Sequence, residues 1–263
     1  MPAPRALSLY VVGCLLVSTT LAGADAAGPP SAALTAIPDL SGRWAQEQVT
    51  TTLTRVPVVG DVRSVTTTLL IVDVQQQDAE LRVRSQVCSI TVDNQPALVR
   101  TVLGDAFVRA LPITERPAHL VQGTAGWQLQ QPRFTEVIGA RLGSPEREPL
   151  PTTMDDPRVV DQDNSGQGGM TVRIEGLVRG EIYVVQRGWN QLQSLRIDSG
   201  YVEGSLRWGN EQVILGASSR FLRRESDARP DPAPGTQRFR MIRIPAETSC
   251  ASILRRGEGL WSR

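Results

Sequence analysis

Three consecutive runs, SVTTTLLIVDVQQ (64–76), QDA (77–79) and ELRVRSQVCSITV (80–92), have the clearest strand and turn pattern in the sequence. The two outer runs are rich in Val, Ile, Leu and Thr, which favour strands, and the short polar run between them is typical of a hairpin turn. One face of the second run carries Leu81, Val83, Ser85 and Val87, and the other face carries Cys88, Ile90 and Val92. The stretch therefore predicts two long antiparallel strands joined by a tight turn.

The same pattern recurs on both sides of this hairpin, from residue 39 to residue 244. About ten strands with short turns, including turns at 178–180 and 209–210, predict an all-β antiparallel meander. Closing a meander into a barrel removes its exposed edges, so we expect a closed barrel with long loop insertions. A two-sheet β-sandwich is the alternative. Residues 96–112 carry a weak helical stripe and are expected to form a short helix or an irregular cover over one barrel end.

The first 26 residues are typical of a secretory signal peptide. One arginine precedes an apolar run (6–21), and small residues in A-x-A cleavage patterns follow it at 22–26. The run VVGC (11–14) also resembles a bacterial lipobox, which would make Cys14 the lipidated first residue of the mature protein. These patterns predict a secreted or periplasmic protein, with a lipid anchor at Cys14 as the alternative form.

The rest of the chain is expected to form one domain. Residues 27–37 are small and contain proline, so they are predicted to be flexible. Residues 38–254 are predicted to form a single β-barrel domain, followed by a C-terminal tail at 255–263. No later segment approaches the roughly 18 apolar residues of a membrane helix, so we expect no transmembrane segment.

Cysteine usage fits export. Removal of the signal peptide would leave Cys88 and Cys250, an even number in an oxidising compartment. We therefore expect a disulfide bond that ties an early strand to the end of the chain, and two free buried thiols are the alternative.

Composition argues against several classes of function. The 28 basic residues are all arginine, and a formal net charge of +1 gives no electrostatic case for binding nucleic acid. The sequence has one histidine, His119, and it has no nucleophile elbow, zinc motif or nucleotide-binding glycine loop. An enzyme is therefore the least favoured of three expectations.

The run VDQDNSGQGG (160–169) has acidic residues at a chemically meaningful spacing. Side chains of Asp161, Asp163 and Ser165 alternate, and the Gln167 carbonyl would follow as a backbone ligand after a turn at glycine. Hard oxygen ligands on a flexible loop are what calcium prefers, and the run resembles the first half of an EF-hand loop. The glutamate that completes such a loop is replaced by Val172. The alternative is a polar turn whose side chains bond their own backbone.

The triplet Gly42-Arg43-Trp44 resembles the G-x-W signature of lipocalins and other calycin barrels. The resemblance implies a barrel in which Trp44 closes one end and packs against an arginine of the last strand, here Arg240 or Arg243. A planar guanidinium can stack on the indole and donate to nearby carbonyls. The general style of the chain also resembles that of secreted bacterial proteins.

These features give an ordered set of expected functions. The first is an exported β-barrel that binds a small apolar ligand without catalysis, with walls from 64–74, 81–87 and 195–208. The second is a structural or interaction protein of the bacterial envelope, stabilised by calcium and one disulfide. The third is an enzyme with polar groups converging near His119.

Overall fold

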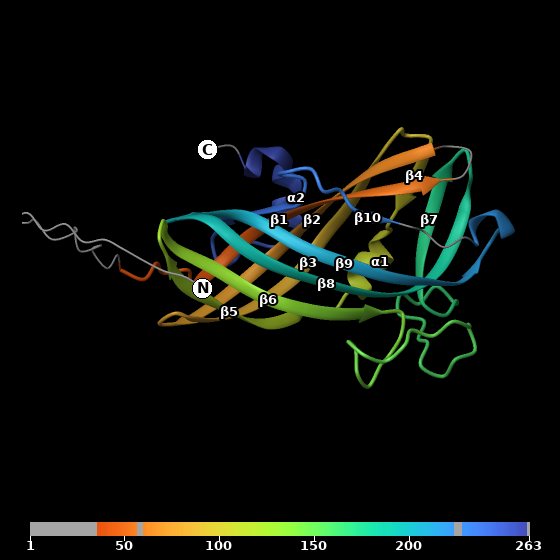
Figure 1. Ribbon diagram of the computed structural model, residues 1–263, viewed down its shortest axis with the longest axis horizontal. Coiled ribbons are helices and arrows are strands. Elements are labelled where there is room, and N and C mark those ends of the chain that lie inside the picture. Colours follow the sequence, from red (N-terminus) through yellow and green to blue (C-terminus); the bar gives the residue numbers. More distant parts are fainter. Residues whose placement is uncertain (1–35, 57–59, 224–227, 262–263) are drawn as a thin grey trace, which may run out of the picture. The chain divides into compact units, whose positions relative to one another are not determined.

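The computed structural model describes residues 36–56, 60–223 and 228–261 (Figure 1). The predicted signal peptide, the lipidation candidate Cys14 and residues 27–35 lie outside the described residues. The strands are β1 (Gly42–Val56), β2 (Gly60–Gln77), β3 (Glu80–Gln95), β4 (Val99–Val102), β5 (Thr114–Gly123), β6 (Gly126–Ile138), β7 (Met170–Gly176), β8 (Gly180–Asp198), β9 (Tyr201–Ala217), β10 (Arg229–Pro230) and β11 (Arg238–Arg243). The helical segments are α1 (Asp105–Ala110), η1 (Arg220–Leu222), α2 (Cys250–Arg256) and η2 (Gly257–Leu260).

Eight of the strands form a closed hydrogen-bonded ring. Its order is β1-β2-β3-β5-β6-β8-β9-β11, and β11 pairs back to β1. Each pairing is antiparallel, so the predicted all-β antiparallel fold is confirmed. A closed barrel and a two-sheet sandwich are both compatible with this ring. Outside it, β7 pairs with the start of β8, β4 pairs with β7, and β10 pairs with β1.

The hairpin predicted for 64–92 is present, with one correction. Strands β2 and β3 pair from Gln77–Glu80 to Arg63–Gln95, but the register shifts between Leu69 and Leu70. The extra residue lies near Cys88 on β3 and reverses the alternation of side chains beyond it. Ile90 and Val92 therefore line the same interior cavity as Ser85 and Val87, rather than the opposite face.

The predicted turn at 209–210 is wrong. Strand β9 continues through these residues and pairs with β8, and the turn lies instead at 199–200. Glycine is required at position 209 for another reason, because a Cβ atom there would lie 2.5 Å from Nε1 of Trp189 on the paired strand. The absence of a side chain at Gly209 leaves space for the indole of Trp189, and the strand continues without a turn.

Two apolar clusters occupy the inside of the fold. The first gathers around Trp44 and includes Val72, Leu192, Val202 and Met241. The second gathers around Phe107 of α1 and Met170 of β7. Of the predicted cover at 96–112, residues 105–110 are helical as α1, and 99–102 form strand β4.

A third cluster lies on the outer side of the ring, where α2 packs near β1 and β2 (Figure 1). It joins Ala45 and Ile71 to Ile253 and Leu260. A disulfide bond between Cys88 and Cys250 attaches the start of α2 to β3. Residues 255–261, expected as a tail, thus belong to this packed segment, because Leu260 is buried in the same cluster as Ile253.

The long insertion between β6 and β7 packs against β8 and β9. Leu150 lies with Val185 and Leu215 in a fourth apolar cluster. Arg158 holds the insertion together by ion pairs to Glu148 and Asp156. The Asp156 carboxylate accepts hydrogen bonds from the Arg158 side chain and backbone, which lowers its pKa to about 2. Within the described residues, no helix is both long enough and apolar enough to span a membrane.

Candidate functional site

A cavity of about 420 Å³ lies inside the ring, between the Trp44 cluster and the Phe107 cluster. Leu70 and Leu206 reach it from the first cluster, and Phe107 and Ile138 reach it from the second. Its polar wall carries Gln46, Gln48, Thr66, Thr68, Gln131 and Asn190. The cavity therefore offers both apolar and hydrogen-bonding surface.

The inward faces of two neighbouring strands explain why a cavity forms at this level. On β2, Val74, Val72 and Leu70 point inward first, and Thr68 and Thr66 follow. On β1, Trp44 is likewise followed by polar inward residues. Large apolar side chains fill one half of the ring, whereas the shorter and polar side chains leave space in the other half.

Arg116 of β5 is the central residue of this cavity. Its side chain lies on the same inward face of the strand as Ala118 and Leu120, and only 7 % of the residue is exposed. Its Nη1 atom donates to Oδ1 of Asn190 at 2.7 Å, and its guanidinium carbon lies 5.2 Å from the centroid of the Phe134 ring. Its Nε and Nη2 atoms are buried without a hydrogen-bond partner in the described part of the chain. Buried donors without partners are costly, so this guanidinium is well suited to receive an acceptor from a ligand.

Glu136 of β6 lines the same cavity. Strand β6 has a register shift between Gln131 and Phe134, at Pro132, which has no N–H to donate to the neighbouring strand. This shift reverses the alternation of side chains and turns Glu136 and Ile138 inward. The sequence therefore places a carboxyl group and a guanidinium group in one cavity by way of an irregular strand.

Burial dominates the electrostatics of these two groups. It raises the pKa of Glu136, and the nearby charge of Arg116 opposes the shift. It lowers the pKa of Arg116 to about 10, with the charge of Glu136 acting in the opposite direction. Arg116 is therefore charged at neutral pH. The charges of the two groups affect each other's pKa, but no ion pair joins them within the described residues.

Trp208 gives the cavity a fixed aromatic wall. Its Nε1 atom donates to Oε1 of Gln237 at 2.7 Å, and Nε2 of Gln237 donates in turn to the carbonyl of Thr51 at 2.8 Å. The indole is thus held to β1 through the segment before β11. An aromatic ring whose polar atom is satisfied can present its apolar face to a ligand.

The predicted calcium ligands do lie in one loop, but they bond mainly to backbone groups of the loop and of the start of β7. Oδ1 of Asp161 accepts the N–H of Ser165 at 2.9 Å, and Oδ2 accepts the N–H of Gly166 at 2.8 Å. Oδ2 of Asp163 accepts the N–H of Thr171 at 2.8 Å, whereas its Oδ1 is buried without a partner in the described residues. Gln167 donates its N–H to Oγ of Ser165 at 3.4 Å. Among the described residues, no group of three or more His, Cys, Asp or Glu side chains is arranged to hold a metal.

The residues of the G-x-W pattern meet the last strand of the ring. The guanidinium carbon of Arg243 lies 4.5 Å from the centroid of the Trp44 ring. Arg243 also donates from Nη2 to the carbonyl of Asp39 at 2.8 Å and from Nη1 to the carbonyl of Ser41. Gly42 has a φ of +111°, and a Cβ atom there would lie 3.1 Å from Nη1 of Arg243.

The other candidate arginine has a different environment. Arg240 pairs with Glu47 at 2.8 Å, and its guanidinium carbon lies 4.4 Å from the Trp261 ring centroid. Of the two, Arg243 is the residue that lies over Trp44. His119, the predicted centre of an enzyme, is half-buried on β5 and is absent from the lining of the interior cavity.

Comparison with protein-family models, with curated proteins and with solved structures finds no match to this chain. The candidate site is therefore argued from its geometry alone.

The sequence analysis did not predict Arg116 and Glu136 as site residues. The available signal for Arg116 was its spacing: in a strand, residue 116 lies on the same face as the apolar residues Ala118 and Leu120. Glu136 had no such signal, because the register shift at Pro132 decides which way it faces.

Proposed function

We propose that the interior cavity binds a small organic ligand with an apolar body and an anionic head group. The observation that carries the proposal is Arg116, a charged and buried side chain with two donors that have no partner in the described residues. Charge-assisted hydrogen bonds to a carboxylate or a similar anion would satisfy both donors. The sequence already predicted an apolar ligand. The unpartnered donors of Arg116 are the reason to propose that this ligand also carries an anionic group.

The walls set the expected size and orientation of the ligand. A cavity of about 420 Å³ is at the small end of typical ligand sites. Phe107, Leu103 and Ile90 would contact the apolar body, and Arg116 with Asn190 would hold the head group. The protein would act as an exported carrier or sensor, non-catalytic and lipocalin-like in its use of a ring interior. The Cys88–Cys250 bond supports export, because such bonds persist in oxidising compartments.

The first test uses anilinonaphthalene sulfonate, a fluorescent probe with an apolar body and a permanent anion. We expect saturable binding with increased fluorescence, and the variant Arg116→Met should weaken the affinity by about tenfold or more. Replacing a buried charge by an apolar side chain of similar length should leave the fold intact. The matched control is Arg109→Met on α1, an arginine whose side chain is 73 % exposed. Equal probe affinity in the wild type and in Arg116→Met would contradict the proposal.

The charge of Glu136 predicts a pH dependence of the same binding. Burial raises the pKa of this carboxyl above its ordinary value of 4.5, so it ionises at a higher pH in the folded protein than in the unfolded chain. As pH rises from about 4.5 through the raised pKa, a negative charge develops in the cavity, and the affinity for the anionic probe should fall. The variant Glu136→Gln should bind roughly three- to tenfold more tightly near neutral pH and should lose most of the slope. The sulfonate stays ionised throughout, so an unchanged slope in Glu136→Gln would assign it to another group.

Calcium binding at 161–167 is a second proposal, favoured by one observation. Oδ1 of Asp163 is buried and has no partner in the described part of the chain, and a cation would satisfy it. The hydrogen bonds from Asp161 to Ser165 and Gly166 support the alternative of a self-bonded turn. Calcium in large excess over its Kd should raise the free energy of unfolding by about 2–3 kcal/mol, measured by thermal unfolding with and without chelator. Asp163→Asn should remove this increase, and the exposed Asp155→Asn should not. No shift with calcium would leave the loop as a polar turn.

A further inference from the structure

Exposed apolar side chains occur on three segments of the fold that hydrogen bonds join to one another. Leu177, in the turn between β7 and β8, is 71 % exposed, and Phe221 of η1 is 67 % exposed. Leu98, in the turn between β3 and β4, and Val178 are exposed as well. We call these four residues the apolar edge. In a folded chain, large apolar side chains that share one exposed region mark a surface for binding.

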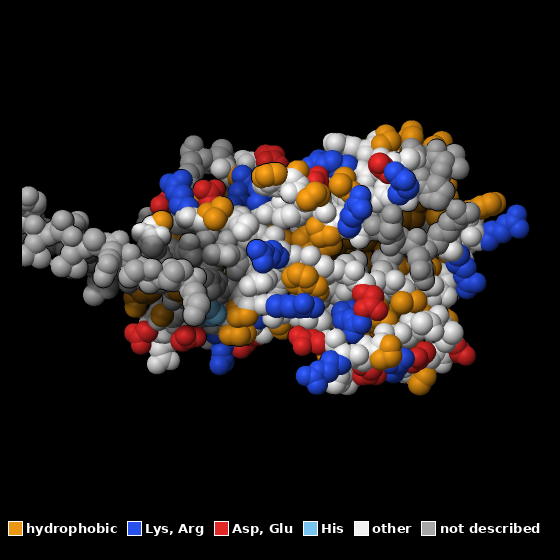
Figure 2. Space-filling model, viewed as in Figure 1, with side chains coloured by type: hydrophobic (Ala, Val, Ile, Leu, Met, Phe, Trp, Pro, Cys, Tyr) orange, Lys and Arg blue, Asp and Glu red, His pale blue; other side chains and the backbone are white. Residues whose placement is uncertain are grey.

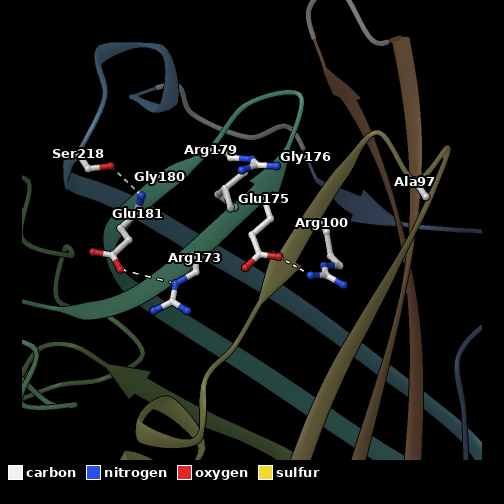
Figure 3. Close-up of a pocket in the computed structure, with 10 residues that line it drawn as sticks. Ala97, Arg100, Arg173, Glu175, Gly176, Arg179, Gly180, Glu181 and Ser218 are labelled. Atoms are coloured by element: carbon white, nitrogen blue, oxygen red, sulfur yellow. Dashed lines mark hydrogen bonds and ion pairs between the residues drawn. The ribbon is translucent and has the colours of Figure 1, made fainter.

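The hydrogen bonds join the two turns to each other and to the segment before η1. The N–H of Leu177 donates to the carbonyl of Leu98 at 2.9 Å. Next to Val178, the N–H of Glu181 donates to Oγ of Ser218 at 2.8 Å, which fixes the start of β8 to the segment that leads into η1 (Figure 3). The apolar edge therefore belongs to the ordered structure and keeps its side chains exposed.

Arginines surround the apolar edge. The segments 96–102, 173–181 and 218–223 carry five arginines against two glutamates, a net charge of +3. The arginines are Arg100, Arg173, Arg179, Arg220 and Arg223. In the groove between the turns, Arg100 pairs with Glu175 and Arg173 with Glu181, so these two glutamates are already neutralised (Figure 3). Arg179 makes no hydrogen bond or ion pair within the described residues, and Arg220 lies over the Phe221 ring at 5.1 Å.

The effect of these arginines on the pKa of Glu175 agrees with the positive net charge of the three segments. The pKa of Glu175 is lowered, first by the hydrogen bond from Arg100 and then by the charges of Arg100, Arg173 and Arg179. Arginine and hydrophobic side chains lie side by side at the right-hand end of the surface view (Figure 2). The partner of this region must therefore offer negative charge at the surface and apolar volume just beneath it.

We propose that the apolar edge docks on a membrane surface that contains anionic lipid. Leu177, Phe221 and Leu98 are exposed on separate segments beside a groove lined by Arg100, Arg173 and Arg179. Separate apolar side chains next to arginines suit insertion among lipid head groups better than contact with a flat protein surface. The arginines would bind lipid phosphates, and their long side chains allow the charge to stay at the level of the head groups. This surface is independent of the interior cavity, because none of its apolar residues lines that cavity.

Co-sedimentation with vesicles tests the proposal on the mature protein. We expect binding to vesicles of phosphatidylcholine mixed with phosphatidylglycerol, little binding to phosphatidylcholine alone, and release at high salt. The variant Leu177→Ser/Phe221→Ser should lose at least about tenfold in vesicle affinity. The variant Arg179→Gln/Arg220→Gln should lose about fivefold or more for each arginine removed.

Matched controls come from the same chain. Leu195→Ser removes an apolar side chain that is 74 % exposed on β8, and Arg109→Gln removes an exposed arginine on α1. Both should bind vesicles as the wild type does. Equal loss in the control variants, or wild-type binding by both edge variants, would overturn the proposal. So would the absence of binding to anionic vesicles by a protein that still binds the sulfonate probe, and that result would leave the cavity proposal intact.

Discussion

Replacing Cys88 and Cys250 together by alanine is expected to lower the free energy of unfolding by about 3–5 kcal/mol. The bond joins residues 162 positions apart, so it closes a loop that holds most of the described chain in the unfolded state. Loop-closure entropy for a ring of this length gives about 5 kcal/mol as an upper value. The bond also fixes the first residue of α2 to β3, and α2 carries Ile253 into the outer apolar cluster.

Chemical denaturation in urea measures this effect, with reduced wild-type protein as the control. The reduced wild type and the double alanine variant should unfold at the same midpoint, because both lack the same constraint. Hydrogen exchange should show that 250–260 loses protection first in both, because the packing of this segment on the ring depends largely on apolar side chains such as Ile253 and Leu260. A double variant as stable as the oxidised protein would show that the bond does not stabilise the fold.

Replacing Trp44 by alanine is expected to lower the free energy of unfolding by about 3–5 kcal/mol. Trp44 has no exposed surface and packs at the centre of the first interior cluster. Its Nε1 atom donates to the carbonyl of Leu40 at 2.9 Å, and Arg243 lies over its ring. The substitution would leave a cavity, a carbonyl without its donor and a guanidinium without its aromatic partner.

Two further variants separate these contributions. Trp44→Phe keeps most of the buried volume and the aromatic face, so it should be less destabilising than Trp44→Ala by about 2 kcal/mol. Arg243→Met removes the cation and its bonds to Asp39 and Ser41 while keeping an apolar stem, and about 1–2 kcal/mol should be lost. Thermal or urea unfolding of all three gives the comparison. A stability of Trp44→Ala close to that of the wild type would show that the ring is not anchored at this residue.

The two proposed binding regions can be tested separately, because they depend on different residues. The interior cavity depends on Arg116 and Glu136, whereas the apolar edge depends on Leu177, Phe221 and exposed arginines. Variants in one region should leave binding at the other unchanged, because the two sets of side chains share no member. A carrier that collects or delivers a ligand at a membrane would use both.

Much of the fold was predictable because it rests on local pattern. Val, Thr and Leu at alternate positions in 64–92 predicted the β2–β3 hairpin, and the spacing of such runs predicted an antiparallel all-β chain. The disulfide followed from cysteine number and from the expected oxidising compartment. These inferences need only composition and the two-residue period of a strand.

The candidate site was not predictable in the same way. Its two charged groups are 20 positions apart in sequence, and they line one cavity because β5 and β6 both contribute inward faces to one ring. The calcium loop shows the reverse case: its spacing was visible, but the oxygens of Asp161 accept hydrogen bonds from the loop's own N–H groups. Spacing predicts which side chains lie near each other, whereas their partners depend on the final backbone.

Local sequence pattern was therefore enough to predict the strand content, the β2–β3 hairpin and the cysteine pair of this protein. Tertiary structure alone decided which residues face the interior beyond each irregular strand position. One extra residue near Cys88 turns Ile90 and Val92 inward, and one shift at Pro132 turns Glu136 toward the cavity of Arg116. The physical reason is that a strand alternates strictly between two faces, so a single unpaired residue exchanges the faces of every residue that follows.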